Sequence, residues 1–115
     1  MSKLFFYRDI NINVKANEDV KVKIEYPDAG TTGHTFINIP GNNDTEVTNE
    51  GEEIIGKGSD LISAPTIITS NPSNVAAEID KVRVNIYVNN KQIVEHNNPK
   101  PEERDPQLVV LVNFN

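Results

Sequence analysis

The sequence predicts an all-β fold, an antiparallel β-sandwich of immunoglobulin-like size and rhythm with seven to eight strands. Short segments of alternating apolar and polar residues recur along the 115 residues, and clusters of Pro, Gly, Asn and Asp separate them. No window of a dozen residues keeps apolar residues at helical spacing. The cysteine pair and tryptophan of immunoglobulin domains are both absent, so the subtype stays open, with a barrel as the alternative.

The N-terminal part contains the first strands. Ile10, Ile12 and Val14 alternate with asparagines, and residues 20–26 alternate apolar with charged side chains. A turn-like segment, 15–19, separates the two runs, so we expect neighbouring antiparallel strands. Residues 4–7 are strand-forming, and a weaker strand fits 34–39.

The second half repeats the pattern. Residues 82–88 alternate, and Asn89-Asn90 suits a hairpin turn because asparagine tolerates positive φ. The return strand ends near His96, with its register open. A further strand fits 65–69, and the almost wholly apolar 107–114 predicts a strand that is covered on both faces or paired centrally.

Other local signals concern turns. Residues 27–30, 40–43 and 71–74 have turn chemistry, and 52–55 fits a short strand before a glycine-rich turn. One helical turn is expected around Ser73 to Ala77, after Pro72. All these elements fit one compact domain, residues 1–115.

Charge and composition narrow the function. Seventeen acidic against eleven basic residues give a net charge of −6, which argues against nucleic-acid binding. The absence of cysteine excludes disulfides and thiolate chemistry. Neither a signal peptide nor a membrane-spanning segment is recognisable, so a soluble cytoplasmic protein without membrane contact is the default expectation. Export by a route that reads no signal peptide stays open.

One segment, GEEIIGKGSD at 51–60, nearly matches the phosphate-binding pattern G-x-x-x-x-G-K-[ST]. Its context argues against a phosphate loop, because no buried strand precedes it and Pro65 follows closely. We interpret Gly56 to Asp60 as a turn and Lys57 as a counter-charge to Glu52 or Glu53.

The Gly/Asn-rich, acidic region 41–60 gives the alternative function, a small-ligand module for calcium or carbohydrate. Its side chains supply the hard oxygens that calcium takes, with amide carbonyls of Asn42 and Asn43 nearby. The candidate metal ligands are Asp44, Glu46, Glu50, Glu52 and Glu53. Their spacing is not that of an EF-hand, and a solvated acidic loop is the competing interpretation.

Catalysis is not predicted. His34 or His96 could be combined with Ser59 and Asp60 on paper, but nothing in the pattern places them together, so no catalytic residue and no cofactor other than calcium is expected.

The longest irregular stretch, Glu95 to Gln107, is rich in proline and mixed charge. Stiff loops at one end of a sandwich are suited to recognition. Tyr87 lies on the polar side of its strand and is the aromatic residue expected at the surface. The candidate interaction residues are therefore Tyr87, Pro99, Lys100, Pro101, Glu102 and Arg104.

The segment GKGSDLISAPTIITSNPSN, residues 56–74, resembles uncharacterised small β-sandwich proteins that carry a glycine-rich turn, Asp-Leu and then a Thr/Ile strand. The resemblance implies the fold and no activity. The leading hypothesis is a non-enzymatic module that contacts a protein partner or a second copy of itself, as a structural or accessory subunit of a larger assembly.

Overall fold

A computed structural model describes residues 3–41 and 44–115, and these ranges form an all-β protein. They contain nine strands, one or two more than predicted, and a single helical turn, α1 (Gly58–Leu61). In chain order the strands are β1 (Leu4–Ile12), β2 (Asp19–Glu25), β3 (Thr31–Asn38), β4 (Thr45–Thr48), β5 (Gly51–Lys57), β6 (Thr66–Asn74), β7 (Lys81–Val88), β8 (Lys91–Pro99) and β9 (Gln107–Phe114).

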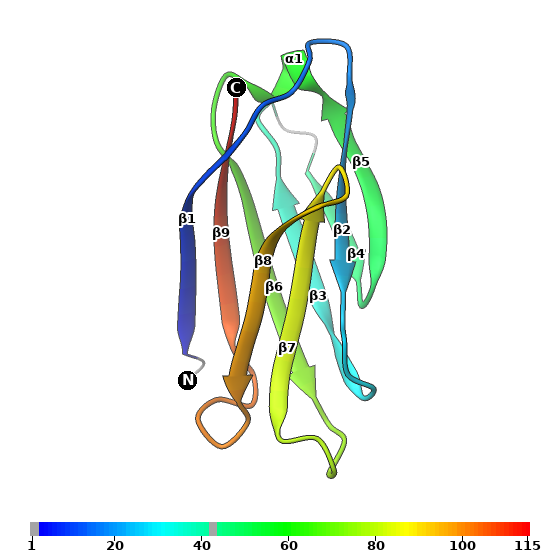
Figure 1. The fold of residues 1–115 in the computed structure, drawn as a ribbon, viewed down its shortest axis with the longest axis vertical. Coiled ribbons are helices and arrows are strands. Elements are labelled where there is room, and N and C mark those ends of the chain that lie inside the picture. Colours follow the sequence, from blue (N-terminus) through cyan, green and yellow to red (C-terminus); the bar gives the residue numbers. More distant parts are fainter. Residues whose placement is uncertain (1–2, 42–43) are drawn as a thin grey trace.

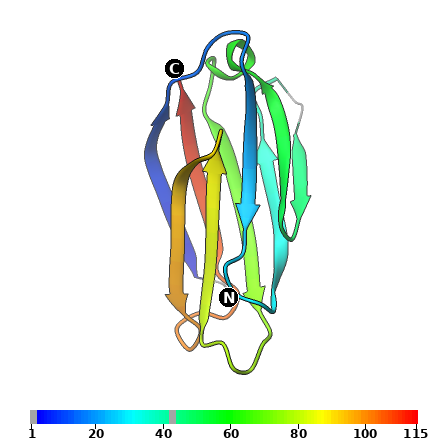
Figure 2. The same ribbon diagram turned by 45° about the vertical axis from the view of Figure 1, so that its right-hand side comes forward.

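The strands form two sheets that face each other in an elongated molecule of 45 × 22 × 22 Å (Figures 1 and 2). One sheet has the order β1-β9-β6-β3-β4, and the other has the order β5-β2-β7-β8. β1 pairs with β9 in parallel, whereas the other neighbouring strands of the described ranges are antiparallel.

The core lies between the sheets because alternate side chains of each strand point inward. Val22 and Ile86 of the four-stranded sheet are fully buried, as are Ile37, Ile68 and Val110 of the five-stranded sheet. All five belong to one continuous apolar cluster. The alternation seen in the sequence therefore marks the inward face correctly.

The expectation that 10–14 and 20–26 are neighbouring strands is wrong. β1 ends at Ile12 and lies beside β9, whereas β2 lies between β5 and β7 in the other sheet. The connection crosses from one sheet to the other, and the Val14 N–H donates to the Asn115 carbonyl at 2.9 Å. Alternation identifies the buried face of a strand and carries no information about its partner.

The helical turn expected at Ser73 to Ala77 is also wrong, because β6 runs through Pro72 to Asn74. Pro72 is tolerated there because β6 has only one partner at that point. It pairs with Gly33 of β3, whereas the described pairing with β9 stops at Ser70. The missing N–H of proline therefore interrupts no ladder on the open side.

The hairpin of β7 and β8 is confirmed. Asn89 and Asn90 form its turn with φ of 48° and 68°, the paired positive values of a type I′ turn. β8 continues beyond His96 to Pro99, and β9 is paired on both sides, by β1 and β6. No helix within the described ranges is long and apolar enough to cross a membrane.

Candidate interaction surface

The near-match to a phosphate loop is part of the scaffold. The N–H groups of Gly58 and Ser59 donate to the carbonyls of Glu18 and Ala16, each at 2.9 Å. A Cβ on Gly58 would lie 2.0 Å from the Lys15 carbonyl oxygen, so glycine is required for close packing. These donors are consumed inside the protein and are not presented to a phosphate.

Lys57 is a counter-charge, although not to the residues expected. Its Nζ lies 2.7 Å from Asp19 Oδ1, where β2 and β5 pair. The interpretation that it neutralises Glu52 or Glu53 is therefore wrong. Glu52 instead lies 3.9 Å from Lys21 Nζ. Register across the strands, rather than proximity in sequence, decides these pairs.

The five candidate metal ligands are divided between the two sheets. Asp44 and Glu46 lie at or beside β4, and Glu52 and Glu53 lie on β5. Glu50, between these strands, accepts a hydrogen bond from the Tyr26 N–H at 3.2 Å. Within residues 3–41 and 44–115 no three His, Asp or Glu side chains form a group that could hold a metal ion.

Two of these carboxylates have protein partners. Asp44 Oδ1 accepts a hydrogen bond from the Ile39 N–H at 3.0 Å. Glu46 Oε2 lies 2.7 Å from His34 Nδ1 on the neighbouring strand. The two further donors considered from the sequence, Asn42 and Asn43, lie outside the described residues.

The second histidine, His96, is buried and hydrogen-bonded through both ring nitrogens. Its Nδ1 lies 2.6 Å from the Tyr7 hydroxyl, and its Nε2 lies 2.7 Å from Asn98 Oδ1. Burial lowers the pKa of His96 and outweighs the opposing effects of Asn98 and Glu102. The structure does not bring either histidine to Ser59 or Asp60 in a catalytic arrangement.

The buried series of hydrogen bonds from Tyr7 through His96 to Asn98 holds the base of the 100–106 loop in place. Asn98 Nδ2 donates to the carbonyls of Pro99 and Glu103, both at 2.9 Å. Since both amide hydrogens are donated, Oδ1 faces His96 and accepts its Nε2–H. Nδ1 then accepts the Tyr7 hydroxyl hydrogen, which fixes a neutral tautomer. Tyr7 keeps its proton because burial raises its pKa.

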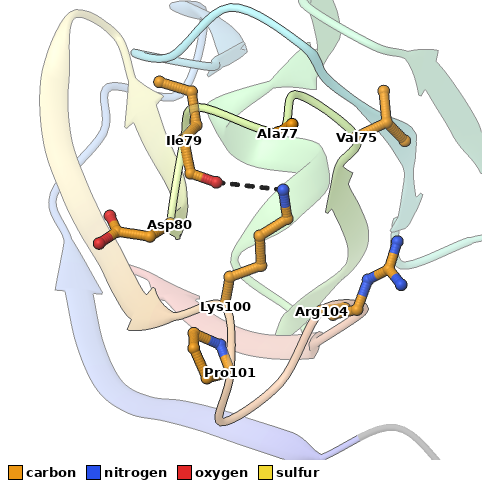
Figure 3. A pocket seen from close by; sticks show the side chains of 7 residues that line it. All are labelled: Val75, Ala77, Ile79, Asp80, Lys100, Pro101 and Arg104. Carbon is orange, nitrogen blue, oxygen red and sulfur yellow. Dashed lines mark hydrogen bonds between the residues drawn. The ribbon is translucent and has the colours of Figure 1, made fainter.

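Beside that loop the structure forms an open hollow of about 460 Å³, shown in Figure 3. It lies between the β6–β7 connection and the loop after β8. Three of the predicted interaction residues line it, namely Lys100, Pro101 and Arg104. The other lining residues come from the β6–β7 connection: Val75, Ala77, Ile79 and Asp80.

Lys100 fixes the two sides of the hollow to each other. Its Nζ donates to the carbonyls of Ala76 at 2.8 Å and Ile79 at 3.1 Å, the second drawn as a dashed line in Figure 3. Its backbone N–H donates to the Asp80 carbonyl at 2.7 Å. The residue predicted to contact a partner is therefore a structural tie that links the two walls of the hollow.

The remaining lining presents apolar surface, the cation of Arg104 and the exposed carboxylate of Asp80. Val75 is 69% exposed, and Pro101 is exposed opposite it. Arg104 is exposed at the rim, and no carboxylate of the described ranges forms an ion pair with it. An open apolar hollow with a guanidinium at its edge suits an apolar side chain that is next to an acidic group.

The other predicted interaction residues lie elsewhere or have other roles. Pro99 ends β8, and Glu102 pairs with Lys3. Tyr87 lies near the opposite end of β7 from Lys81, the partner of Pro99. Six residues of strand separate them by roughly 20 Å. Tyr87 there hydrogen-bonds Glu25 at 3.1 Å.

No protein-family model and no curated protein sequence matches the chain. Sequence reasoning missed the wall at 75–80 because its residues, VAAEID, gave only a turn-like signal. The structure shows that Val75 in this segment is exposed, and the sequence pattern alone does not indicate this.

Proposed function

We propose that the protein is a non-enzymatic interaction module, a β-sandwich of immunoglobulin-like character that binds a protein partner through the hollow at its loop end. The observation that carries the proposal is the preformed hollow of about 460 Å³ with apolar walls and Arg104 at its rim. Binding there costs little ordering, because Lys100 already links the two connections that form it.

The partner chemistry follows from the lining. Val75, Ala77 and Pro101 offer apolar contact, and Arg104 offers a planar guanidinium for a carboxylate. We therefore propose a partner segment in which an apolar side chain inserts into the hollow and a neighbouring Asp or Glu pairs with Arg104. Because the protein has a net charge of −6, it repels an acidic segment overall, and the positive charge of Arg104 is what would attract the segment to the hollow.

Absence of catalysis is part of the proposal. Both ring nitrogens of His96 are used inside the protein, and His34 forms a surface pair with Glu46. The Tyr7–His96 pair is enclosed in the protein and the His34–Glu46 pair lies on an open surface, so we assign a catalytic role to neither. The calcium or carbohydrate alternative gains no supporting contact from the described residues.

Site-specific photo-crosslinking tests the proposal. A photo-crosslinking residue replaces Val75 in one variant and Ile54, which is 58% exposed on β5, in a matched control. The proteins are irradiated in extract of the source cells. We expect one defined partner to be joined at position 75, absent at position 54, and lost when Arg104→Glu is added.

Two outcomes would contradict the proposal. The first is the same set of adducts from both positions, which would indicate random encounters. The second is a partner at position 75 whose capture is unchanged by Arg104→Glu, which would remove the recognition chemistry. Retained thermal stability of each variant shows that loss of capture is not loss of fold.

A further inference from the structure

The outer face of the five-stranded sheet is unusually apolar for a surface that nothing in the described chain covers. Phe6 is 46% exposed and Phe36 is 43% exposed. The apolar side chains of this face come from four neighbouring strands: Leu4 and Phe6 of β1, Val109 and Leu111 of β9, Ile67 of β6, and Phe36 of β3. A contiguous exposed patch of this kind marks an interaction site.

Strand register places three of these apolar side chains in one row across the sheet, with Thr69 in the middle of the row and Glu46 at its end. Phe6 is paired with Val109, Val109 with Thr69, Thr69 with Phe36, and Phe36 with Glu46. The row thus crosses the whole sheet from β1 to β4. One edge of the face ends in an aromatic ring and the other in a carboxylate.

The β1 edge also carries a positive charge. The Arg8 guanidinium lies over the Phe6 ring, 4.4 Å from its centroid, a favourable cation–π contact. Arg8 lies in the irregular segment between Tyr7 and Ile10, where the register of β1 with β9 shifts, and its contact with the Phe6 ring keeps the guanidinium on the Phe6 side of the sheet. The stacked pair, Phe6 with Arg8, forms an amphipathic projection.

The β4 edge carries a hollow of opposite character at the same height on the sheet. This hollow, about 290 Å³, is lined by Phe36, Asn38, Asp44, Thr45 and Glu46. It offers one aromatic wall and two carboxylates. The projection at one edge and the hollow at the other are therefore complementary, because each presents an aromatic ring and their charges are opposite in sign.

We propose that this face binds a second copy of the same chain, with a two-fold axis parallel to the strands and passing over β6, the middle strand. That rotation places β1 of each copy over β4 of the other. Phe6 and Arg8 then enter the partner's hollow against Phe36, Asp44 and Glu46, and the contact occurs twice. A self-complementary patch of this kind gives a closed dimer.

The available area is sufficient for a reversible dimer. Five strands spaced about 4.8 Å apart, over about six residues of strand length, give a face of roughly 500 Å² per copy. Two copies would bury roughly 1,000 Å², the lower end for specific interfaces. Packing of two sheets face to face is an established arrangement. This surface is separate from the loop-end hollow, so the proposed dimer and the proposed binding of a partner at the hollow can be tested independently of each other.

Charge reversal in two different variants tests the pairing. Arg8→Glu has net charge −6 − 2 = −8, and Glu46→Arg has −6 + 2 = −4. Each variant alone places like charges together at both contacts of a homodimer. Mixed in equal amounts, they restore both attractive contacts in a heterodimer. Mass is measured by sedimentation equilibrium up to about 1 mM protein.

We expect the wild-type protein to approach twice the 12.8 kDa mass of one chain, each variant to remain a monomer, and the mixture to dimerise. Lys91→Glu and Glu53→Arg are controls with the same net charges, because both residues are exposed on the four-stranded sheet. They should dimerise like the wild type. A monomeric wild type, variants that dimerise normally, or a mixture that stays monomeric would each overturn the proposal.

Discussion

His96 of β8 is a buried base that is hydrogen-bonded to Tyr7 of β1, close to the 100–106 loop. It is 2% exposed, packs edge-on against Phe5 at 4.6 Å between ring centroids, and is neutral in its hydrogen-bonded tautomer. Protonation would place a second N–H opposite a hydroxyl that already donates. Protonation of His96 is therefore expected to lower the free energy of unfolding.

The pH dependence follows from the lowered pKa of His96. In the unfolded chain a histidine binds its proton near pH 6.5, whereas the folded protein does so only at lower pH. The unfolded state thus holds more protons in that window, and the free energy of unfolding falls as the pH drops below about 6.5. Denaturant titrations between about pH 7.5 and pH 5.5 measure this effect.

Two variants identify the titrating group. His96→Gln should lose the pH dependence in this window, and His34→Gln, which removes the exposed histidine, should retain it. If His34→Gln abolished the dependence instead, the assignment to His96 would be wrong.

Lys100 contributes to stability through the hydrogen bonds of its ammonium group. Lys100→Met removes the ammonium donors to the Ala76 and Ile79 carbonyls, and we expect a loss of roughly 1–2 kcal/mol in the free energy of unfolding. The Ile79 amide, which donates to Ala76 at 3.2 Å, should exchange its hydrogen faster. Lys81→Met, at an exposed lysine nearby, is the control, and equal effects from both would contradict the structural role.

Among the elements, the β7–β8 turn is the one most directly open to design. Asn89 Oδ1 accepts a hydrogen bond from the Lys21 N–H at 2.8 Å, which links the turn to β2. Asn90 has φ of 68° and no such tie among the described residues. Glycine adopts this backbone conformation without strain.

We therefore expect Asn90→Gly to raise the free energy of unfolding by roughly 0.5–1 kcal/mol. Asn89→Gly should lower it, because the contact with Lys21 is lost. Chemical denaturation of the two variants separates these effects. Equal stabilisation by both would mean that backbone conformation alone matters at this turn.

The sequence predicted those strands in which the alternation of apolar and polar residues matches the alternation of buried and exposed side chains in the sheet. Residues 20–26 and 82–88 alternate cleanly and became β2 and β7, at the centre of their sheet. β4 was missed because its buried residue, Val47, stands alone among polar side chains. The strand predicted at 65–69 stops short of the end of β6 at Asn74, because Asn-Pro at 71–72 is a turn signal unless the partner strand is known.

Three residues of the proposed interaction surface were already candidates from the sequence. Lys100, Pro101 and Arg104 lie in one irregular segment, so composition alone drew attention to them. The facing wall at 75–80 comes from another connection, and only the pairing of β7 with β8 brings the two together. Tyr87 was grouped with them because the alternation of its strand predicts that its side chain is exposed. The same pattern does not give the distance between Tyr87 and the loop.

Across the whole molecule, acidic residues are distributed over both sheets rather than concentrated. We expect millimolar calcium to leave the melting temperature unchanged, because no three acidic groups of the described residues converge. Magnesium at the same ionic strength is the control for charge screening. A rise in melting temperature with calcium alone would favour the small-ligand alternative and would place ligands beyond the described residues.

The parallel pairing of β1 with β9 has a consequence for how the molecule assembles. Leu4 pairs with Gln107 and Phe6 with Val109, so the first strand of the sandwich joins its last strand in chain order. High contact order of this kind slows folding, because loop-closure entropy must be overcome before the contact contributes. Until β9 is made, β1 and its exposed aromatic ring lack their neighbour. The nascent chain thus passes through a stage in which this strand is available to chaperones or to another copy.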